Sequence, residues 1–313
     1  MYAYVIRRIV ATIPVMAVVG IFVFLLLHIT PGDPAAIIAG DYANPADIAK
    51  IRARLGLDQP IHVQFAKWVG QLAHGDLGVS IFSNLPVTKL IGQRLEPTLA
   101  LSVLTTILSI LIAVPLGVFA AWRAGTLVDR ATMVFAVLGF SVPIFVIGYI
   151  LMYVFAIELK WFPAQGYKPI ADGFWPFLRS IVLPSIALAT LYTALIARIS
   201  RASVLEVLTE DYIRTAHAKG LSSPIVLMRH ALRNAAVPIV TIIGIGIALL
   251  IGGVVVTESV FNIPGLGRLT VDAILHRDYP VIQAIILVFS GVYVFINLLA
   301  DLAYTLFDPR IRY

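Results

Sequence analysis

The chain contains no cysteine and few charged residues. Of its 313 residues, 13% are Asp, Glu, Lys or Arg and 60% are hydrophobic, against about 25% charged and roughly 45–50% apolar in an average soluble domain. So few charges could not cover the surface of a soluble protein, so a water-soluble fold is nearly excluded. Without cysteine, neither disulfides nor thiolate metal sites can form. The net charge of +6 in so apolar a chain indicates membrane orientation rather than nucleic-acid binding.

Motifs for catalysis and metal binding are also missing. The phosphate-binding loop G-x-x-x-x-G-K-[ST] does not occur, and Lys219-Gly220 has the wrong order, so we expect that the chain alone cannot hydrolyse ATP. No nucleophile and base can be recognised, and the six histidines lack metal-ligand spacing. We therefore expect no catalytic residue and no metal site. The histidines are His28, His62, His74, His217, His230 and His276.

Six long stretches carry no Asp, Glu, Lys or Arg. Crossing about 30 Å of hydrocarbon takes about 20 helical residues, so each stretch is long enough, the fourth only just. Backbone groups in lipid must be satisfied internally, which predicts helices. We expect an all-α, polytopic membrane protein with six transmembrane helices. The stretches are Ile9–Gly32, Pro97–Trp122, Ala131–Ile157, Ser180–Ala197, Asn234–Thr257 and Tyr279–Ala300.

The Lys and Arg residues predict the orientation of these helices. With a cytoplasmic N-terminus, twelve Lys or Arg residues lie in inside segments and five in short outside loops. The long segment 33–96 carries six more, but loops of that length cross the membrane largely regardless of charge. We expect both termini in the cytoplasm. The twelve are Arg7, Arg8, Arg123, Arg130, Arg198, Arg201, Arg214, Lys219, Arg229, Arg233, Arg310 and Arg312, and the five are Lys160, Lys168, Arg179, Arg268 and Arg277.

These boundaries divide the chain into an N-terminal transmembrane helix (1–32), an extracytoplasmic loop region (33–96), a five-helix core (97–307) with a cytoplasmic loop (198–236), and a cytoplasmic tail (308–313). The outside region contains the amphipathic stretch Pro45–Leu55 and the aromatic Phe65–Trp68. We expect short helices there, on the membrane or on a partner. The turn-rich stretch Asn262–Gly267 suggests irregular backbone near the mouth of a cavity.

The cytoplasmic loop is predicted to contain a short helix, Glu210–Lys219. Thr209 can cap it, Glu210 and Asp211 complement its N-terminal dipole, and Lys219 precedes Gly220 at its end. A second segment begins at Pro224, capped by Ser222 or Ser223.

One apolar ridge is expected on the first helix, at Leu208, Tyr212 and Ala216. Such a helix suits docking into a groove of a soluble partner. An ordinary surface helix that packs on its own spans is an equally open alternative.

The residues of this loop resemble a known family. Arg214–Gly220, followed by Arg229–Ala235 and Pro238, is similar to the EAA-type coupling loop of ABC importer permeases, in the version of the dipeptide, oligopeptide and nickel permeases. The resemblance covers essentially the whole chain and is strongest to B-type subunits of peptide importers, with glutathione permeases also similar. Arg214 stands where the general motif has Glu, and His217 replaces its usual Arg. Further matching stretches are Pro31–Pro34, Leu55–Pro60, Gly75–Ser80, Phe261–Leu269, Arg277–Pro280 and Asp308–Arg310.

The resemblance implies a type I ABC importer permease in a bacterial inner membrane. Its partners would be a second permease subunit, most simply a paralogue, two ATPase subunits that bind ATP and Mg²⁺, and an extracytoplasmic binding protein. The substrate would be a di- or oligopeptide or glutathione, and no cofactor would bind this chain. Coupling to the ATPase is implied for Glu210, Asp211, Tyr212, Arg214, Thr215, Ala216, His217, Ala218, Lys219 and Gly220.

Two other classes of membrane protein are alternatives. An ion-coupled secondary transporter needs ionisable groups at membrane depth, and the six stretches contain only His28. A structural or insertase-type protein would leave the cytoplasmic helix unexplained. Small or hydroxyl-bearing residues within the spans could line a path or serve close helix packing. The candidates for the path are Ser102, Thr105, Pro143, Gly244 and Gly246.

Overall fold

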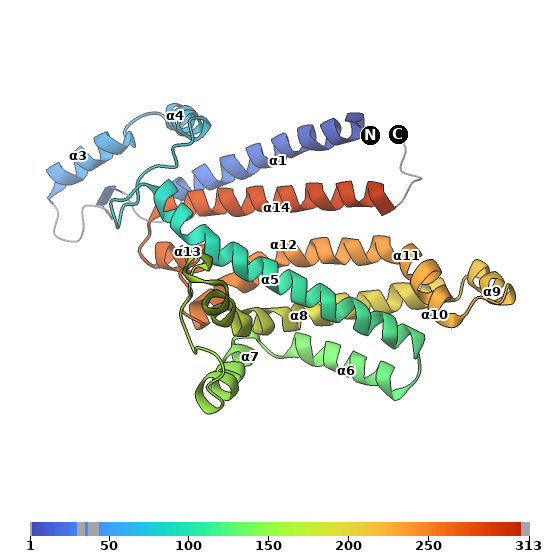
Figure 1. Ribbon diagram of the computed structural model, residues 1–313. Helices are drawn as coiled ribbons and strands as arrows, with labels where there is room; N and C mark the ends of the chain where they lie inside the picture. Colours follow the sequence, from blue (N-terminus) through green and yellow to red (C-terminus); the bar gives the residue numbers. More distant parts are fainter. Residues whose placement is uncertain (1, 30–34, 37–43, 308–313) are drawn as a thin grey trace.

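The computed structural model describes residues 2–29, 35–36 and 44–307, and these form helices with no β-strand beyond one isolated bridge between Val79 and Pro86. Five of the described helices contain a segment long and apolar enough to cross a membrane, and up to six if a bent pair counts as one span. They form a bundle with short helices at both ends (Figure 1). The five are α1 (Tyr2–Ile29), α5 (Val87–Trp122), α8 (Phe174–Leu208), α12 (Ala236–Val260) and α14 (Tyr279–Phe307).

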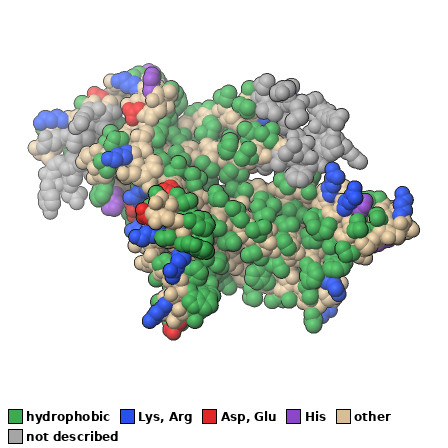
Figure 2. All heavy atoms as spheres, in the orientation of Figure 1, with side chains coloured by type: hydrophobic (Ala, Val, Ile, Leu, Met, Phe, Trp, Pro, Cys, Tyr) green, Lys and Arg blue, Asp and Glu red, His purple; other side chains and the backbone are tan. Residues whose placement is uncertain are grey.

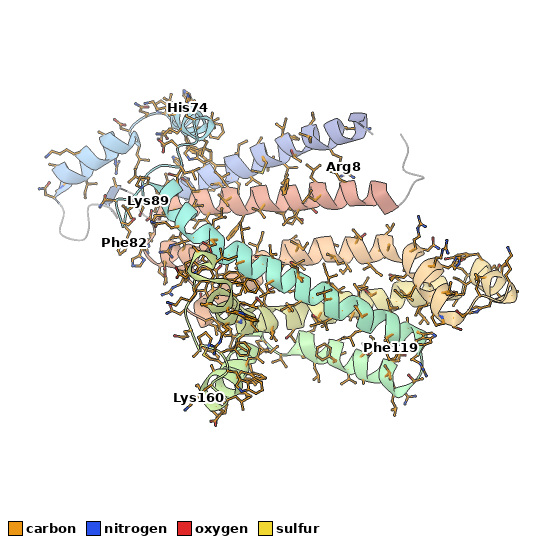
Figure 3. The ribbon with its side chains drawn as sticks, viewed as in Figure 1. Arg8, His74, Phe82, Lys89, Phe119 and Lys160 are labelled. Atoms are coloured by element: carbon orange, nitrogen blue, oxygen red, sulfur yellow. The ribbon has the colours of Figure 1, made fainter. Side chains whose placement is uncertain are left out.

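The bent pair replaces the third predicted span. α6 (Leu127–Ser141) ends before Pro143, and α7 (Ile144–Leu151) continues into the π-helix η1 (Met152–Glu158) at an angle of 103° to α6. Val142, which precedes the proline, is extended at φ −91° and ψ 123°, as proline favours for the residue before it. The expectation of one continuous helix over Ala131–Ile157 is therefore wrong. η1 leads to Lys160, which lies away from the bundle in Figure 3.

Two helices extend well past the charge-free stretches that predicted them. α5 begins at Val87 instead of Pro97, and α8 runs from Phe174 to Leu208 instead of Ser180–Ala197. Their ends include Lys89, Arg94, Arg201 and other charged side chains. The predicted outside region therefore ends inside α5, and the helices project beyond the hydrocarbon.

α8 is the central helix of the bundle. Its most apolar window is 72% buried, against 22% for that of α5, and α5, α6, α7 and α12 all pack on it. Glycines allow this close approach, because a Cβ on any of three of them would lie under 3 Å from an α8 atom: Gly117 (Ala197 O and Ser200 Cβ), Gly139 (Ala194 Cβ) and Gly253 (Leu188 Cδ1).

The outer surface of the bundle is apolar. α1 is only 11% buried over its most apolar window, and large hydrophobic side chains such as Val18, Leu111 and Val137 are exposed. Figure 2 shows hydrophobic side chains over the middle of one face and Lys and Arg towards its two ends. This is the surface expected of a protein surrounded by lipid.

The outside region forms the two short helices α3 (Pro45–Leu55) and α4 (Ile61–Ala73). Phe65 and Trp68 of α4 pack on Phe24 of α1, with ring centroids 5.2 and 5.7 Å away, and Gln64 contacts His28 at 3.2 Å. The aromatic cluster thus rests on the chain's own first helix. The stretch Pro31–Pro34 and the tail 308–313 lie outside the described residues.

Gly117→Ala is expected to destabilise the bundle, because its methyl group would meet the α8 backbone; overpacking of this kind costs about 1–3 kcal/mol. Gly92→Ala is the matched control on the same helix, since a Cβ there meets nothing within 4 Å. Membrane abundance and thermal unfolding in detergent check both variants. Equal stability of the two would contradict the close packing of α5 on α8.

Candidate coupling, translocation and gating sites

The predicted cytoplasmic helix exists as α9 (Asp211–Ala218), with Glu210 as N-cap and Lys219 as C-cap residue. Gly220 follows at φ +81°, a left-handed conformation that glycine adopts freely. Thr209 does not cap this helix, contrary to expectation. It ends α8 instead, and its Oγ1 donates a hydrogen bond to the Glu206 carbonyl at 2.7 Å.

The two faces of α9 have different roles. Ile213 and Ala216 are buried at 3% and 7% exposure and pack with apolar residues of α5, α8, η3 (Val226–Ala231) and α12. Tyr212 is 41% exposed, so Tyr212 and Ala216 do not form one ridge, and that expectation is wrong. The exposed residues of α9 and its ends are Glu210, Asp211, Tyr212, Arg214, Thr215, His217, Ala218, Lys219 and Gly220.

The second segment of the loop follows the predicted pattern. Ser222 is the N-cap residue of α10 (Ser223–Ile225), and Pro224 lies in the first turn. η3 and α11 (Leu232–Asn234) then lead into α12. Val226 and Ala231 are almost fully buried and pack with Ile213. The whole loop is thereby fixed to the spans, with one face of α9 left open.

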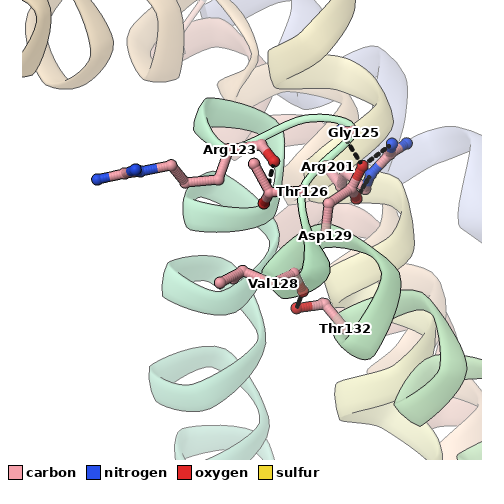
Figure 4. Close-up of polar contacts among 7 residues, drawn as sticks. All are labelled: Arg123, Gly125, Thr126, Val128, Asp129, Thr132 and Arg201. Carbon is pink, nitrogen blue, oxygen red and sulfur yellow. Dashed lines mark hydrogen bonds and ion pairs between the residues drawn. The ribbon is translucent and has the colours of Figure 1, made fainter.

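A partly buried ion pair joins α6 to α8 near the same end. The Arg201 guanidinium binds both carboxylate oxygens of Asp129, through Nε to Oδ1 and through Nη2 to Oδ2 at 2.7 Å (Figure 4). The Gly125 amide also donates to Oδ2, at 2.9 Å. Bidentate pairing of this kind gives a fixed geometry, so it holds the start of α6 against α8.

An apolar groove of about 420 Å³ lies between α5, α12 and α14. Ser102 lines it, together with Thr98 and Thr106. The Ser102 hydroxyl donates to the Thr98 carbonyl at 2.8 Å, and the Thr106 hydroxyl donates to the Ser102 carbonyl at 2.8 Å. Because these hydroxyls bond their own helix, the groove has a weakly polar wall.

The other path candidates do not line this groove. Thr105 is fully buried, Gly244 is buried, and Pro143 is exposed at the break between α6 and α7. Gly246 lines a separate cavity of about 10 Å³ beside Tyr192 of α8. Of the five candidates, the structure therefore brings only Ser102 to the groove.

Two matching sequence stretches that are far apart meet at the other end of the bundle. Ser80 Oγ donates to Asp278 Oδ2 at 2.5 Å, and the Ile81 amide donates to Oδ1 at 3.1 Å. The rings of Phe82 and His276 lie 4.0 Å apart. Phe82 and Lys89 lie at this end in Figure 3, away from Phe119 at the other end. Asp278 is buried, so this contact anchors the loop before α5 to the turn between α13 (Leu266–Leu275) and α14.

The same end contains an open cavity of about 720 Å³, lined by Lys168, Arg179, Trp175 and others. Beside it, the Tyr167 hydroxyl donates to Glu96 at 2.9 Å. Burial, and then this hydrogen bond, raise the pKa of Tyr167 above its ordinary value. The sequence does not indicate this cavity, and in the sequence Glu258 is recognisable only as the charged residue that ends the fifth charge-free stretch. Within the described ranges, no three His, Cys, Asp or Glu side chains form a possible metal site.

A bundle of helices long and apolar enough to cross a membrane, with the short helix α9 attached at one end, defines a polytopic membrane protein. Residues 113–313 match the family described as binding-protein-dependent transport system inner membrane component, and residues 1–102 match the N-terminal family of such membrane components. The chain belongs to this family of inner membrane components of binding-protein-dependent transport systems, and is a multi-pass ABC importer permease.

Relatives and solved structures agree with this assignment. A probable peptide ABC transporter permease of Sinorhizobium fredii is 58% identical over 100% of both chains. A putative peptide transport system permease of Brucella abortus is 45% identical, and a glutathione transport system permease of Salmonella paratyphi A 44% identical, each over 100% of both chains. The fold is similar to a chain of the inward-facing methionine ABC transporter MetNI, with TM-score 0.58, 16% identity, and coverage of 71% of this chain and 97% of that one.

Arg201→Met is expected to destabilise the protein by about 1–3 kcal/mol, because it leaves the buried Asp129 carboxylate without its partner. Asp129→Asn combined with Arg201→Met should cost less than the sum of the single variants. Unfolding in detergent of the two singles and the double measures this coupling. Strict additivity would show that the pair contributes nothing to holding α6 on α8.

Proposed function

We propose that this permease moves peptides, including short ones such as glutathione, into the cytoplasm as one half of a two-permease channel. An extracytoplasmic binding protein delivers the peptide, a paralogous permease completes the channel, and two separate ATPases bind ATP and Mg²⁺. The chain itself performs no catalysis. Full-length relatives described as peptide and glutathione permeases support the substrate class.

The observation that carries the coupling role is that α9 packs on the protein with one face only. Ile213 and Ala216 fix the helix to α5, α8 and α12, while its other side remains exposed. A short helix with a free face suits insertion into a groove of a partner. We assign ATPase contact to Asp211, Tyr212, Arg214, Thr215, His217, Ala218 and Lys219, and a supporting role to Glu210, Ala216 and Gly220.

The orientation belongs to the same proposal. The starts of α1 and α9 and the end of α14 lie at one end of the bundle (Figure 1), and the Lys and Arg distribution puts that end in the cytoplasm. The end with α3, α4 and α13 is then extracytoplasmic. We call this end of the bundle the outer end.

The transporter reconstituted in proteoliposomes is expected to take up a labelled dipeptide, oligopeptide or glutathione only with ATP, both ATPases, the second permease and the loaded binding protein. ATP hydrolysis should require the ATPase subunits, because this chain has no phosphate loop. Uptake driven by an ion gradient without ATP would favour the secondary-transporter alternative. Uptake of none of the three substrates would contradict the substrate class.

Tyr212→Ala is expected to weaken ATPase binding at least tenfold while membrane abundance is kept. An interface hot spot contributes about 2 kcal/mol or more, and about 1.4 kcal/mol corresponds to tenfold in affinity. Tyr153→Ala is the matched control, since Tyr153 is exposed on η1, away from α9. ATPase co-purification measures the effect. Normal co-purification and transport with Tyr212→Ala would show that Tyr212 is not part of the interface. Ala216→Arg should instead lower membrane abundance, because Ala216 is buried against the chain's own helices.

Single cysteines at Asn44 and Ser222 are expected to report opposite sides of the membrane. The chain has no native cysteine, so an impermeant thiol reagent on intact cells reads only the introduced residue. Asn44→Cys should react and Ser222→Cys should react only after permeabilisation. The reverse pattern would overturn the orientation.

A further inference from the structure

Glu258 is a buried carboxylate that the coupling and substrate roles leave unused. It lies in the last turn of α12 at 0% exposure, and it forms no ion pair in the part of the chain that the structure describes. Burying a charge without a cation is costly unless hydrogen bonds compensate for it. Its partners therefore indicate what it does.

Those partners join three helices. Thr98 of α5 donates its hydroxyl to Glu258 Oε1 at 2.5 Å, and the Arg268 amide of α13 donates to Oε2 at 2.9 Å. Thr98 Oγ1 in turn accepts the Leu266 amide at 2.8 Å. Leu266 and Arg268 are in the first turn of α13, where amides lack helical acceptors and the dipole favours a negative charge. The carboxylate and the hydroxyl together cap α13.

Two glycines, Gly265 just before α13 and Gly267 in its first turn, leave room for this carboxylate. A Cβ on Gly265 would overlap the Glu258 carboxylate, and a Cβ on Gly267 would lie 2.6 Å from Val255 Cα. Gly265 has φ −104°, a value open to any residue, so space rather than backbone conformation requires glycine there. The Glu258 carboxylate thus lies against the stretch Asn262–Gly267, for which the sequence predicts irregular backbone.

The capped turn stands at the apolar groove. Thr98, Val254 and Leu266 are among the residues that line this groove between α5, α12 and α14. Leu266 and Leu269 also pack on Leu90 of α5 and Ile285 of α14. α13 therefore borders the outer end of the groove, where its Leu266 is part of the wall, and Glu258 and Thr98 hold α13 in place.

We propose that Glu258, Thr98 and the first turn of α13 form a latch that keeps the outer end of the groove closed and releases when substrate is admitted from outside. Glu258 is a positioning residue that acts through α13. Water that reaches the turn can replace hydrogen bonds of this kind, so the latch can open without unfolding. The assignment rests on the proposed function for its direction, because import requires entry at this end.

Ser102→Cys is a reporter of opening, because Ser102 lines the groove one turn beyond Thr98. In the assembled resting transporter, Thr98→Val is expected to speed labelling of this cysteine by an impermeant outside reagent at least tenfold. Thr98→Ser, which keeps the hydroxyl, should restore slow labelling. Glu258→Gln should also speed labelling, and combined with Thr98→Val it should add little, since both break one latch.

Two controls separate a latch from a purely structural cap. Thr132→Val removes an equally buried hydroxyl from α6, where it bonds only its own helix, and should leave Ser102→Cys labelling unchanged. Ser109→Cys, buried one turn beyond Thr105 and outside this groove, should stay unreactive in every background. Faster labelling of both reporters, failure of Thr98→Ser to rescue, or unchanged labelling with Thr98→Val would each overturn the latch. The readout uses no substrate, so a failed peptide-uptake assay leaves it intact.

Discussion

The close packing of neighbouring helices on α8 is the constraint on which the rest of the structure depends. Lipid tails are as apolar as Leu side chains, so apolar side chains gain no hydrophobic free energy by exchanging lipid contacts for contacts with another helix. Helices in a membrane therefore associate through close van der Waals contact. Gly117, Gly139 and Gly253 provide that contact from α5, α6 and α12. α8 is then fixed along its length, and its C-terminal extension carries Arg201 and leads to α9. The packing of these glycines on α8 therefore helps to fix where α9 lies.

The packing also explains how a force on α9 can reach the spans. Ile213 and Ala216 contact a cluster that includes Val118 of α5, Val204 of α8 and Ile239 of α12. Close-packed interiors transmit displacement because they have few voids. A partner that moves the exposed face of α9 would thus move the ends of three membrane helices together. Packing on its own spans, which the structure shows, and the proposed docking on a partner use two different faces of α9.

Much of the fold could be predicted from the sequence, because desolvating a charge is so costly that charge-free stretches locate the spans. The ends of the helices could not be predicted in this way, because charged residues mark the edge of the hydrocarbon and α5 and α8 continue past that edge. Nor could the break at Pro143, because Pro14, Pro97, Pro115 and Pro184 lie inside continuous helices. Neighbouring helices can satisfy the freed backbone groups at a proline, and one sequence does not show which prolines have such neighbours. The burial of Glu258 was equally hidden, since its partner Thr98 is 160 residues away.

α9 and α13 lie at opposite ends of the permease and are held by different sets of interactions, and the difference suits the proposed direction of import. At the end that we propose to be cytoplasmic, α9 is held by apolar packing, which water does not replace. At the outer end, α13 is held in part by hydrogen bonds from Thr98 and Arg268 to Glu258, and water competes for such bonds once it reaches them. A conformational change that brings water to these hydrogen bonds can therefore release α13, while α9 stays packed on α5, α8 and α12. In the proposed mechanism, hydrogen bonds at α13 would let the outer end open, while apolar contacts would keep α9 fixed to the spans so that it continues to transmit force.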